Sequence, residues 1–136
     1  MADHNGTHTV HTPDSLFQAY GSGKRNFSGV NLANEKLDSA DLKGADFSYA
    51  DFSDSDLSGA NLRGVDFSYA VLQGTNLADA DLQGTILIGA DLREAVLTKA
   101  NLRNAVYDPQ ETKFPQGFDL AGTEMRSDHA VESQTS

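Results

Sequence analysis

The stretch ADFSYADFSDSDLSGANLRGVDFSYA, residues 45–70, contains the same five residues twice: DFSYA stands at 46–50 and again at 66–70. Around both copies the chain is a series of five-residue units, each with Leu or Phe in the middle. The units run without a gap from residue 25 to residue 109, which makes seventeen of them. An internal repeat of this kind has to be recognised before any helix or strand is assigned.

A period of five fits neither common element of secondary structure. On an α-helix, steps of five would scatter the central Leu and Phe residues around the whole cylinder. On a flat strand they would alternate between the two faces, so half of them would point into water. A chain that turns a corner once per unit avoids both problems. The central residue, and the small residue two positions before it, can then point inward in every unit.

The separation of twenty residues between the two DFSYA copies predicts four units per coil. Stacking the units four at a time aligns similar segments, such as DLKGA at residue 41 with NLRGV at residue 61. The same stacking places five large residues in one column: Phe27, Phe47, Phe67, Leu87 and Tyr107. If neighbouring coils lie about 4.8 Å apart, as paired strands do, roughly four coils form a rod about 20 Å tall. Contacts between neighbouring coils hold such a solenoid together.

The units resemble those of the pentapeptide repeat family: a small residue, then Asp or Asn, then Leu or Phe, then two polar or turn residues. The resemblance covers residues 25–109. It implies an all-β fold, a right-handed quadrilateral β-helix with the central and small residues inside and the other three positions outside. The handedness comes from the resemblance alone, because periodicity does not determine it.

The segments before and after the repeats differ from them in composition. Thr12, followed by Pro13 and Asp14, reads as the start of a helix, so residues 12–24 are predicted to form a capping α-helix and linker over the first coil. Residues 110–121 contain Phe114, Phe118 and Leu120 and are predicted to form a non-repetitive C-terminal cap. This ending resembles those of pentapeptide repeat proteins of cyanobacteria and plants. The polar segments 1–11 and 122–136 are predicted to be flexible tails.

Composition excludes several classes of function. The 136 residues include no cysteine, which rules out disulfides, thiolate metal sites and a cysteine nucleophile. The formal charge of −10 argues against binding nucleic acid through phosphates, which requires concentrated Lys and Arg. No stretch approaches the 18 or so consecutive apolar residues of a spanning helix, and the N-terminus does not read as a signal peptide. We therefore expect a cytoplasmic protein that binds no membrane.

Signs of chemistry are few. The sequence contains no glycine-rich phosphate loop, no nucleophile motif and no cofactor signature, so we expect no enzyme and no cofactor. The histidines His4, His8 and His11 could suggest a metal site, but a flexible tail is the better interpretation, because a metal site needs ligands held in place. The many aspartates are the ordinary residue before each central Leu. We therefore interpret the chain as a scaffold or protein-interaction module.

Two outward-facing groups are candidates for contact with a partner. If the family geometry holds, Tyr49 and Tyr69 stack at one corner, with three apolar residues above them where the repeat prefers polar ones: Ile86, Ile88 and Val106. Exposed apolar patches beside aromatics often mark contact surfaces, so this face is predicted to bind a protein or a second copy. The alternative is that Ile and Val merely favour strands or lie under the C-terminal cap.

The second group is acidic. It comprises Asp46, Asp51, Asp54, Asp56 and Asp66, and no basic residue lies between positions 44 and 62. A solvated surface explains it best. The alternative hypothesis is imitation of DNA, because the family includes proteins that bind bacterial DNA gyrase as duplex mimics. Against mimicry, the rod is short, and three basic residues interrupt the acid: Lys43, Arg63 and Arg103.

Overall fold

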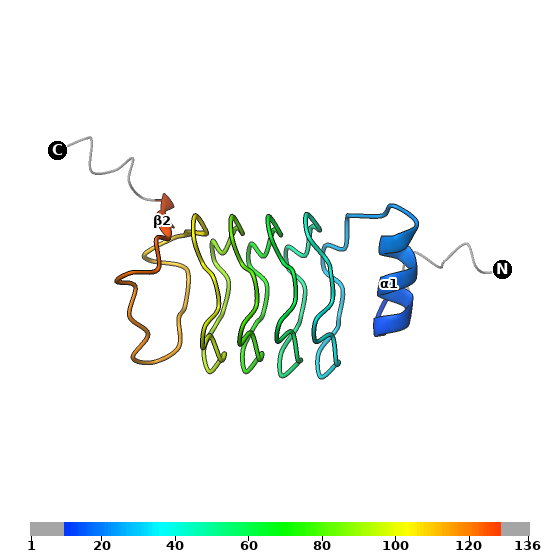
Figure 1. The fold of residues 1–136 in the computed structure, drawn as a ribbon, viewed down its shortest axis with the longest axis horizontal. Helices are drawn as coiled ribbons and strands as arrows, with labels where there is room; N and C mark the ends of the chain where they lie inside the picture. The colour runs from blue at the N-terminus through cyan, green and yellow to red at the C-terminus, as the bar shows by residue number, and fades with distance from the viewer. Residues whose placement is uncertain (1–9, 129–136) are drawn as a thin grey trace.

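The computed structural model describes residues 10–128. Within them, the residue before each central Leu or Phe pairs in parallel with the residue twenty positions later, in an unbroken series from Asn26↔Asp46 to Ile86↔Val106. The main chain therefore winds into coils of twenty residues, each with one five-residue unit on each of four sides. Figure 1 shows these coils stacked along a rod. The predicted spacing of four units per coil is confirmed by this pairing.

The coils and their sides are numbered here in chain order. Coil 1 comprises four units, which are sides 1 to 4 in turn: 25–29, 30–34, 35–39 and 40–44. Coils 2, 3 and 4 repeat this arrangement in residues 45–64, 65–84 and 85–104, and unit 105–109 begins a fifth coil on side 1. Within a unit, the first position is the small residue, the second is the paired residue, and the third is the central Leu or Phe.

The core is a column of third-position side chains inside the coils. Every one from Phe27 to Leu92 is at most 1% exposed. On side 1 the phenylalanine rings stack from coil to coil, with centroids 5.5 Å apart for Phe27 and Phe47 and 6.1 Å apart for Phe47 and Phe67. Buried hydroxyls at first positions keep a partner, since Thr75 Oγ1 donates to the Phe52 carbonyl at 2.8 Å. Burial of these apolar side chains is the main stabilising term of the fold.

The corners explain the fifth position of each unit. All sixteen fifth-position residues from Gly29 to Asn104 have positive φ, and nine of them are not glycine. At fifteen of these sixteen corners the third-position carbonyl accepts a hydrogen bond from the N–H three residues later, as the Phe47 carbonyl does from Ala50 at 3.0 Å. A β-turn with positive φ only at its third residue is of type II, a turn that favours Gly or Asn there.

The second position is explained by a side-chain contact. At most of these positions Oδ1 of an Asp or Asn accepts the N–H of the fourth-position residue in the same unit, as Asp66 does from Ser68 at 2.8 Å. The same contact joins Asn76 to Ala78 at 3.0 Å. Asp and Asn form such turns with their own backbone more readily than other residues. The repeated acid is thus part of how each side of the coil is built.

The N-terminal end is covered by helix α1, Pro13–Gly21. Thr12 is its N-cap: Thr12 Oγ1 accepts the N–H of Ser15 at 3.1 Å, and the Ser15 hydroxyl accepts the N–H of Thr12 at 3.2 Å. Leu16 is fully buried against the core, and the Tyr20 hydroxyl donates to the Lys43 carbonyl at 2.7 Å. Figure 1 shows α1 lying across the end of the coil stack.

The C-terminal end continues the coil incompletely. Strand β1, Val106–Tyr107, pairs in parallel with strand β2, Arg126–Ser127, on side 1. On side 2, Lys113 pairs with Asp91. Phe114 stacks on Phe118 with ring centroids 5.0 Å apart, and both pack against the core. The rings of this segment cover part of the last coil.

The flexible C-terminal tail was predicted to begin at residue 122, and residues 122–128 differ from that expectation. They include β2 and the half-buried Met125, which packs against the core. Parallel pairing with β1 fixes the position of this segment, although its sequence lacks the repeat pattern. At the other end, Val10 was predicted to belong to a flexible tail, but it is only 6% exposed and packs in the core. Residues 129–136 and 1–9 lie outside the described part. No helix in residues 10–128 has the length and apolar character needed to cross a bilayer.

Candidate protein-interaction surface

The corner between sides 1 and 2 carries a pair of stacked tyrosines. Tyr49 and Tyr69 are fifth-position residues of successive coils, and their ring centroids lie 5.4 Å apart with planes inclined by 14°. Tyr49 is 65% exposed and Tyr69 is 45% exposed. Both have positive φ, which is uncommon for a bulky side chain. The coil thus presents two aromatic rings to solvent at a position where the backbone favours glycine.

The Tyr69 ring continues the stack toward the C-terminal end. A side chain added at Gly89, the equivalent corner one coil further, would collide with ring carbons of Tyr69, so the ring lies over this glycine. The Tyr69 hydroxyl donates to Oε1 of Glu111 at 2.7 Å. Hydrogen bonding to the Glu111 carboxylate, followed by its negative charge, raises the pKa of Tyr69. Tyr69 therefore links the coil corner to the C-terminal segment.

The three apolar candidates lie beside these rings. Ile86 pairs with Asp66 below it and with Val106 above it on side 1. The Ile88 carbonyl accepts the N–H of Tyr69 at 2.9 Å, so Ile88 lies in the next coil directly beside Tyr69. All three apolar side chains are half-buried. The structure thus brings together the five residues of the Tyr/Ile surface: Tyr49, Tyr69, Ile86, Ile88 and Val106.

The five predicted acidic residues lie on different sides of the rod. Asp46 and Asp66 pair with each other on side 1. The others follow the chain around coil 2: Asp51 is on side 2, Asp54 is at the corner after it, and Asp56 is on side 3. The coil geometry therefore distributes this group over three sides instead of gathering it on one face.

Most of these carboxylates have neighbours in their own unit. Oδ1 of Asp56 accepts hydrogen bonds from the Ser58 hydroxyl at 2.6 Å and from the Ser58 N–H at 2.9 Å. These two contacts, the hydroxyl first, lower the pKa of Asp56. Asp46 and Asp51 make the same pair of contacts with the serines two positions later. This arrangement gives the acidic residues a structural role in the turns.

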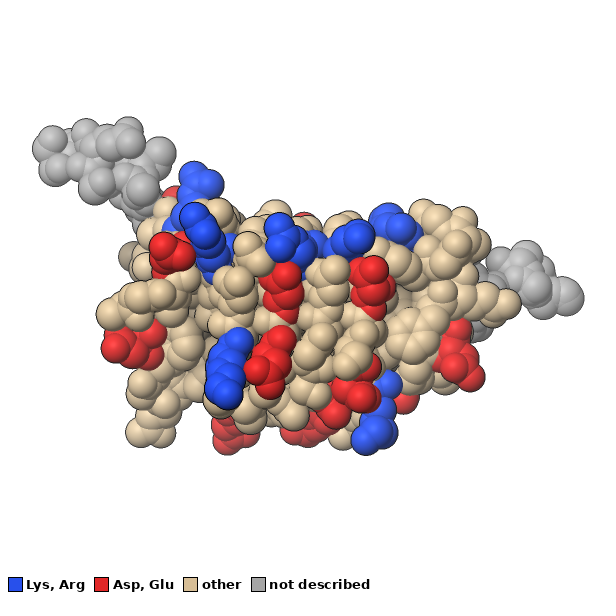
Figure 2. All heavy atoms as spheres, in the orientation of Figure 1, with Lys and Arg blue, Asp and Glu red and all other residues tan. Residues whose placement is uncertain are grey.

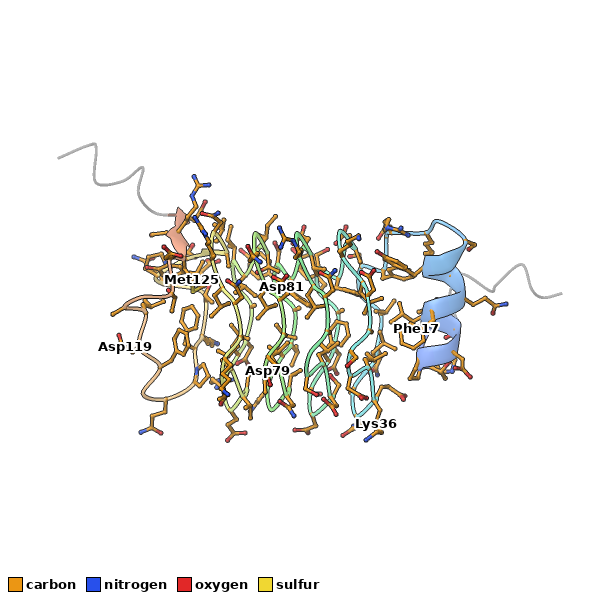
Figure 3. The ribbon with its side chains drawn as sticks, in the orientation of Figure 1. Phe17, Lys36, Asp79, Asp81, Asp119 and Met125 are labelled. Atoms are coloured by element: carbon orange, nitrogen blue, oxygen red, sulfur yellow. The ribbon has the colours of Figure 1, made fainter. Side chains whose placement is uncertain are left out.

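The fourth positions of side 4 form a basic column: Lys43, Arg63, Gln83 and Arg103. Its charges are paired with acids of the same side or of the C-terminal segment. Arg63 Nη1 lies 3.3 Å from Asp81 Oδ2, and Arg103 Nε lies 3.7 Å from Glu124 Oε1. Figure 2 shows basic side chains along the upper margin of the rod, and Figure 3 labels Asp81 below that margin. The side is close to neutral.

A metal site is not assembled in the described part of the chain: residues 10–128 contain no group of three His, Asp or Glu side chains placed to hold an ion. His11 is exposed just before α1. The other two histidines of the N-terminal segment, His4 and His8, lie outside the described residues.

Sequence reasoning missed two partners of Tyr69. Gly89 could have been found, because it stands twenty residues after Tyr69 at a corner where a stacked ring needs an open neighbour. No signal pointed to Glu111, because the segment after residue 109 has no repeat register from which its position could be read.

Comparison with protein families gives a direct result. The family model described as pentapeptide repeats matches in eight copies, over residues 26–64, 46–84 and 75–106. The chain belongs to the pentapeptide repeat family. The matched region comprises the four coils described above, and α1 and the C-terminal segment lie outside it. A search of curated protein sequences finds no match.

Several solved pentapeptide repeat structures are similar. Alr5209 of Nostoc PCC 7120 is 42% identical with a TM-score of 0.85, over 87% of this chain and 97% of that one. HetL of Nostoc sp. strain PCC 7120, involved in heterocyst differentiation regulation, is 31% identical with a TM-score of 0.41, over 76% of this chain and 56% of that one. QnrB1, a plasmid-mediated fluoroquinolone resistance protein, is 18% identical with a TM-score of 0.37, over 80% and 60%. The last two TM-scores are too low to bear on this chain.

Proposed function

We propose that this pentapeptide repeat protein is a non-enzymatic scaffold that binds another protein through the Tyr/Ile surface. In this proposal the coil is right-handed and four-sided, as the family resemblance implies, and α1 closes its N-terminal end. The rigid solenoid holds the five side chains in fixed positions along one corner and one side. The observation that carries the proposal is the exposed stack of Tyr49 on Tyr69.

The backbone at this corner supports a role beyond folding. A left-handed conformation costs an L-residue about 1 to 2 kcal/mol relative to glycine. Four other corners of coils 2 and 3 carry glycine, which avoids that cost: Gly59, Gly64, Gly74 and Gly84. Tyr49 and Tyr69 keep large rings at such positions. A strained conformation that places an aromatic ring in solvent supports a functional hypothesis.

The apolar residues beside the rings support the same surface. On side 1 the second positions read Asn26, Asp46 and Asp66 before changing to Ile86, and the fourth positions read Ser28, Ser48 and Ser68 before changing to Ile88. On side 1, polar side chains are thus first replaced by apolar ones in coil 4, directly above the unit that contains Tyr69. Tyrosine rings flanked by aliphatic side chains are typical of the central part of protein interfaces.

The polar side chains of the coils favour a scaffold over an enzyme. Catalytic acids and bases need freedom to exchange protons with a substrate. Here the recurring Asp and Asn side chains accept main-chain N–H groups, as Asp46 and Asn61 do. The acidic residues also lie on three sides, which favours a scaffold over a DNA mimic.

Affinity capture from a lysate of the source organism tests the proposal. The bait is the full chain, compared with Tyr49→Asn, which places a residue that accepts positive φ at the corner. Phe17→Gln is the matched control, because Phe17 is a 41% exposed aromatic residue on α1, at the other end of the rod (Figure 3). We expect a protein that the parent and the control recover equally and that Tyr49→Asn recovers at least about tenfold less, the effect of losing about 1.4 kcal/mol. Equal recovery by all three baits would disprove the proposal.

The partner in this proposal can also be a second copy of the chain. Sedimentation velocity of the parent, beside a variant with Ile86→Asp and Ile88→Asp, distinguishes the two cases. A parent dimer that the double variant converts to monomer identifies self-association. A parent that is monomeric at all concentrations rules self-association out and leaves a different protein as the partner.

A further inference from the structure

The last complete coil is covered on only part of its upper edge. On side 3, Leu77 of coil 3 is fully buried beneath coil 4, whereas Leu97 of coil 4 is half-buried and Val96 is 44% exposed. The first position of side 4 changes in the same way, from 1% exposure at Ala80 to half-burial at Ala100. No described main-chain segment pairs with coil 4 above side 3. Side 4 is covered in part, because Leu102 is only 5% exposed and the Asn104 N–H donates to the Glu124 carbonyl at 2.9 Å.

The main chain shows the same gap. Between coils 3 and 4, the N–H groups of Leu77 and Asp79 donate to the carbonyls of Val96 and Thr98, at 2.8 and 2.9 Å. One coil further, the equivalent donors are the N–H groups of Leu97 and Lys99. No described residue accepts a main-chain hydrogen bond from either of them.

Side 4 repeats this gap with one donor and one acceptor. Between coils 3 and 4, Leu82 donates to Asn101 at 2.8 Å and the Ala80 carbonyl accepts from Asn101 at 2.9 Å. Their equivalents one coil further are the N–H of Leu102 and the carbonyl of Ala100, and neither has a main-chain partner in the described part of the chain. The open edge therefore comprises unit 95–99 and residues 100–102, and it ends where Asn104 pairs with Glu124.

A cleft lies directly above part of the open edge. It has a volume of about 270 Å³ and lies between two segments, residues 99–102 below and residues 122–124 above. The loop that precedes β2 makes its main-chain hydrogen bond to coil 4 at Asn104 and passes unit 95–99 without pairing. An unpaired sheet edge with a neighbouring cleft is the arrangement that accepts an added strand.

We propose that the open edge binds an extended segment of a partner protein as a parallel strand, in the place of side 3 and the first half of side 4 of a fifth coil. The segment has the sequence small–acidic–Leu, repeated once after two residues. The main chain of this segment hydrogen-bonds to coil 4 in the same way as coil 4 hydrogen-bonds to coil 3. Its first leucine points inward over the half-buried Leu97, and its second lies against Leu102 at the end of the edge. Its small residues stand beside them.

The charges beside the edge select the acidic position. Lys99 is exposed and makes no ion pair with any residue the structure describes. Arg103 Nε lies 3.7 Å from Glu124 Oε1, and this ion pair is weak because both side chains are more than 60% exposed. An acidic side chain at the second position of the bound strand lies outward on this side, near both cations. Such complementarity selects the partner and its register.

The same charges disfavour a second copy as the occupant. Two copies that meet edge to edge would bring Lys99 and Arg103 of both chains together. The opposite end of the rod cannot supply a partner edge, because α1 covers it. The open edge lies on sides 3 and 4, away from the Tyr/Ile surface on side 1, so this inference stands independently of that surface.

The test is a titration of the ¹⁵N-labelled full chain with a synthetic peptide, followed by amide NMR. The probe is acetyl-ADLQGADL-amide, the unit at residues 80–84 followed by its first three residues again. We expect shifts at Leu97, Lys99 and Leu102, and about tenfold slower hydrogen exchange at these amides when the free peptide is at ten times its Kd. The first control peptide carries N-methyl groups on both aspartates, which removes its donors to Ala95 and Ala100. It should not bind.

Variants of the protein complete the test. Lys99→Glu should raise the Kd of the probe at least about threefold, because one favourable charge becomes unfavourable. Lys43→Glu, the same change on side 4 of coil 1, should leave the Kd unchanged. Equal binding of the N-methylated peptide, or no shift at the edge amides, would overturn the proposal.

Two other occupants of the edge would also overturn the proposal. A parent dimer that Val96→Lys dissociates shows that a second copy fills the edge. Edge amides that are protected in the free chain and lose that protection after removal of residues 129–136 show that the chain fills its own edge.

Discussion

The hydroxyl of Tyr69 donates a 2.7 Å hydrogen bond to Glu111, a residue forty-two positions further along the chain. This contact joins a corner of coil 3 to the segment that follows the repeats. The two tyrosines of the stack therefore differ in what holds them. Tyr69 is fixed by Glu111 and lies over Gly89, whereas Tyr49 is more exposed and contacts the stack through one face. Tyr49 is the better position for testing contact with a partner, because its replacement leaves the C-terminal segment attached.

Gly89→Ala should destabilise the protein more than Gly44→Ala. Both glycines have similar positive φ, +73° and +75°, so both variants have the same backbone strain, about 1 kcal/mol. An added Cβ at Gly44 meets no atom, whereas at Gly89 it meets the Tyr69 ring. We expect Gly89→Ala to lose roughly 1 kcal/mol more in urea unfolding, in line with the cost of overpacking.

A double-mutant cycle assigns that difference to the ring. With Tyr69→Asn as the background, Gly89→Ala should cost no more than Gly44→Ala, since the Cβ then has space. If the two alanine variants are equally stable in the parent, the ring does not lie over Gly89 in solution.

Glu94→Gly should stabilise the protein. Glu94 has φ of +64° at an exposed corner, where its side chain makes no described hydrogen bond. Glycine removes the left-handed strain but adds entropy to the unfolded chain, which leaves a net gain of about 0.5 kcal/mol. Thermal unfolding measures the gain. Gln73→Gly is the control, because Gln73 does not have positive φ, and it should lose about 0.5 to 1 kcal/mol. An unchanged or lower Tm for Glu94→Gly contradicts the strain argument.

The repeating part of this fold could be predicted from the sequence because the position of a residue within its unit determines whether it is buried. Central residues are buried whatever unit they stand in, and the period of five places a corner after every unit. Tyr69 was therefore predicted to face outward at a corner although its residue type does not favour positive φ. The stack of Phe27, Phe47 and Phe67 followed from the twenty-residue spacing in the same way.

What could not be predicted depends on the segment beyond the repeats. Leu97 is a central residue like Leu77, yet it is half-buried because no coil lies above it. Its burial is decided by residues 110–127, whose path has no period. Glu111 and β2 were missed for the same reason. The acidic group was predicted around the second coil, with Asp66 one coil on. Neighbours on the same side of the rod are twenty residues apart, so Asp51 and Asp56 lie on different sides.

Acid should weaken the contact between Asp91 and Arg93. Arg93 donates to both carboxylate oxygens of Asp91, at 2.9 and 2.6 Å, and these hydrogen bonds, chiefly, lower the pKa of Asp91 below its ordinary value of 3.8. A lowered folded-state pKa means that the contact stabilises the protein above pH 3.8. The contribution is lost as the pH falls from there through the folded-state pKa.

Asp91→Asn tests this pH dependence, since Asn keeps the turn contact but not the charge. At pH 7 we expect a loss of about 0.5 kcal/mol, the size typical of a pair whose arginine is half exposed. The difference from the parent should shrink as the pH is lowered below 3.8, measured by urea unfolding at each pH. With Arg93→Gln as the background, Asp91→Asn should have little effect at any pH. A difference that stays constant from pH 7 to pH 2.5 in the parent refutes the assignment to charge.

DNA gyrase should be unaffected by this protein. A duplex mimic needs acidic groups along one continuous surface, whereas Asp46, Asp51 and Asp56 lie on three sides of the rod. Side 4 carries the basic column that includes Arg63 and Arg103. Four coils at about 4.8 Å each also span little more than half of a B-DNA turn of roughly 34 Å.

A supercoiling assay with purified gyrase and micromolar full-length protein decides between the two functions. We expect the same supercoiling rate with and without the protein, and the same sensitivity of gyrase to a fluoroquinolone. An acidic pentapeptide repeat protein already known to inhibit gyrase in the same assay is the positive control. Inhibition or drug protection by this protein would favour mimicry. The next variant would replace Asp46 and Asp66 by Asn, which keeps both turn contacts. If this variant lost the effect, the side 1 carboxylates would be its source, and the scaffold proposal would be wrong.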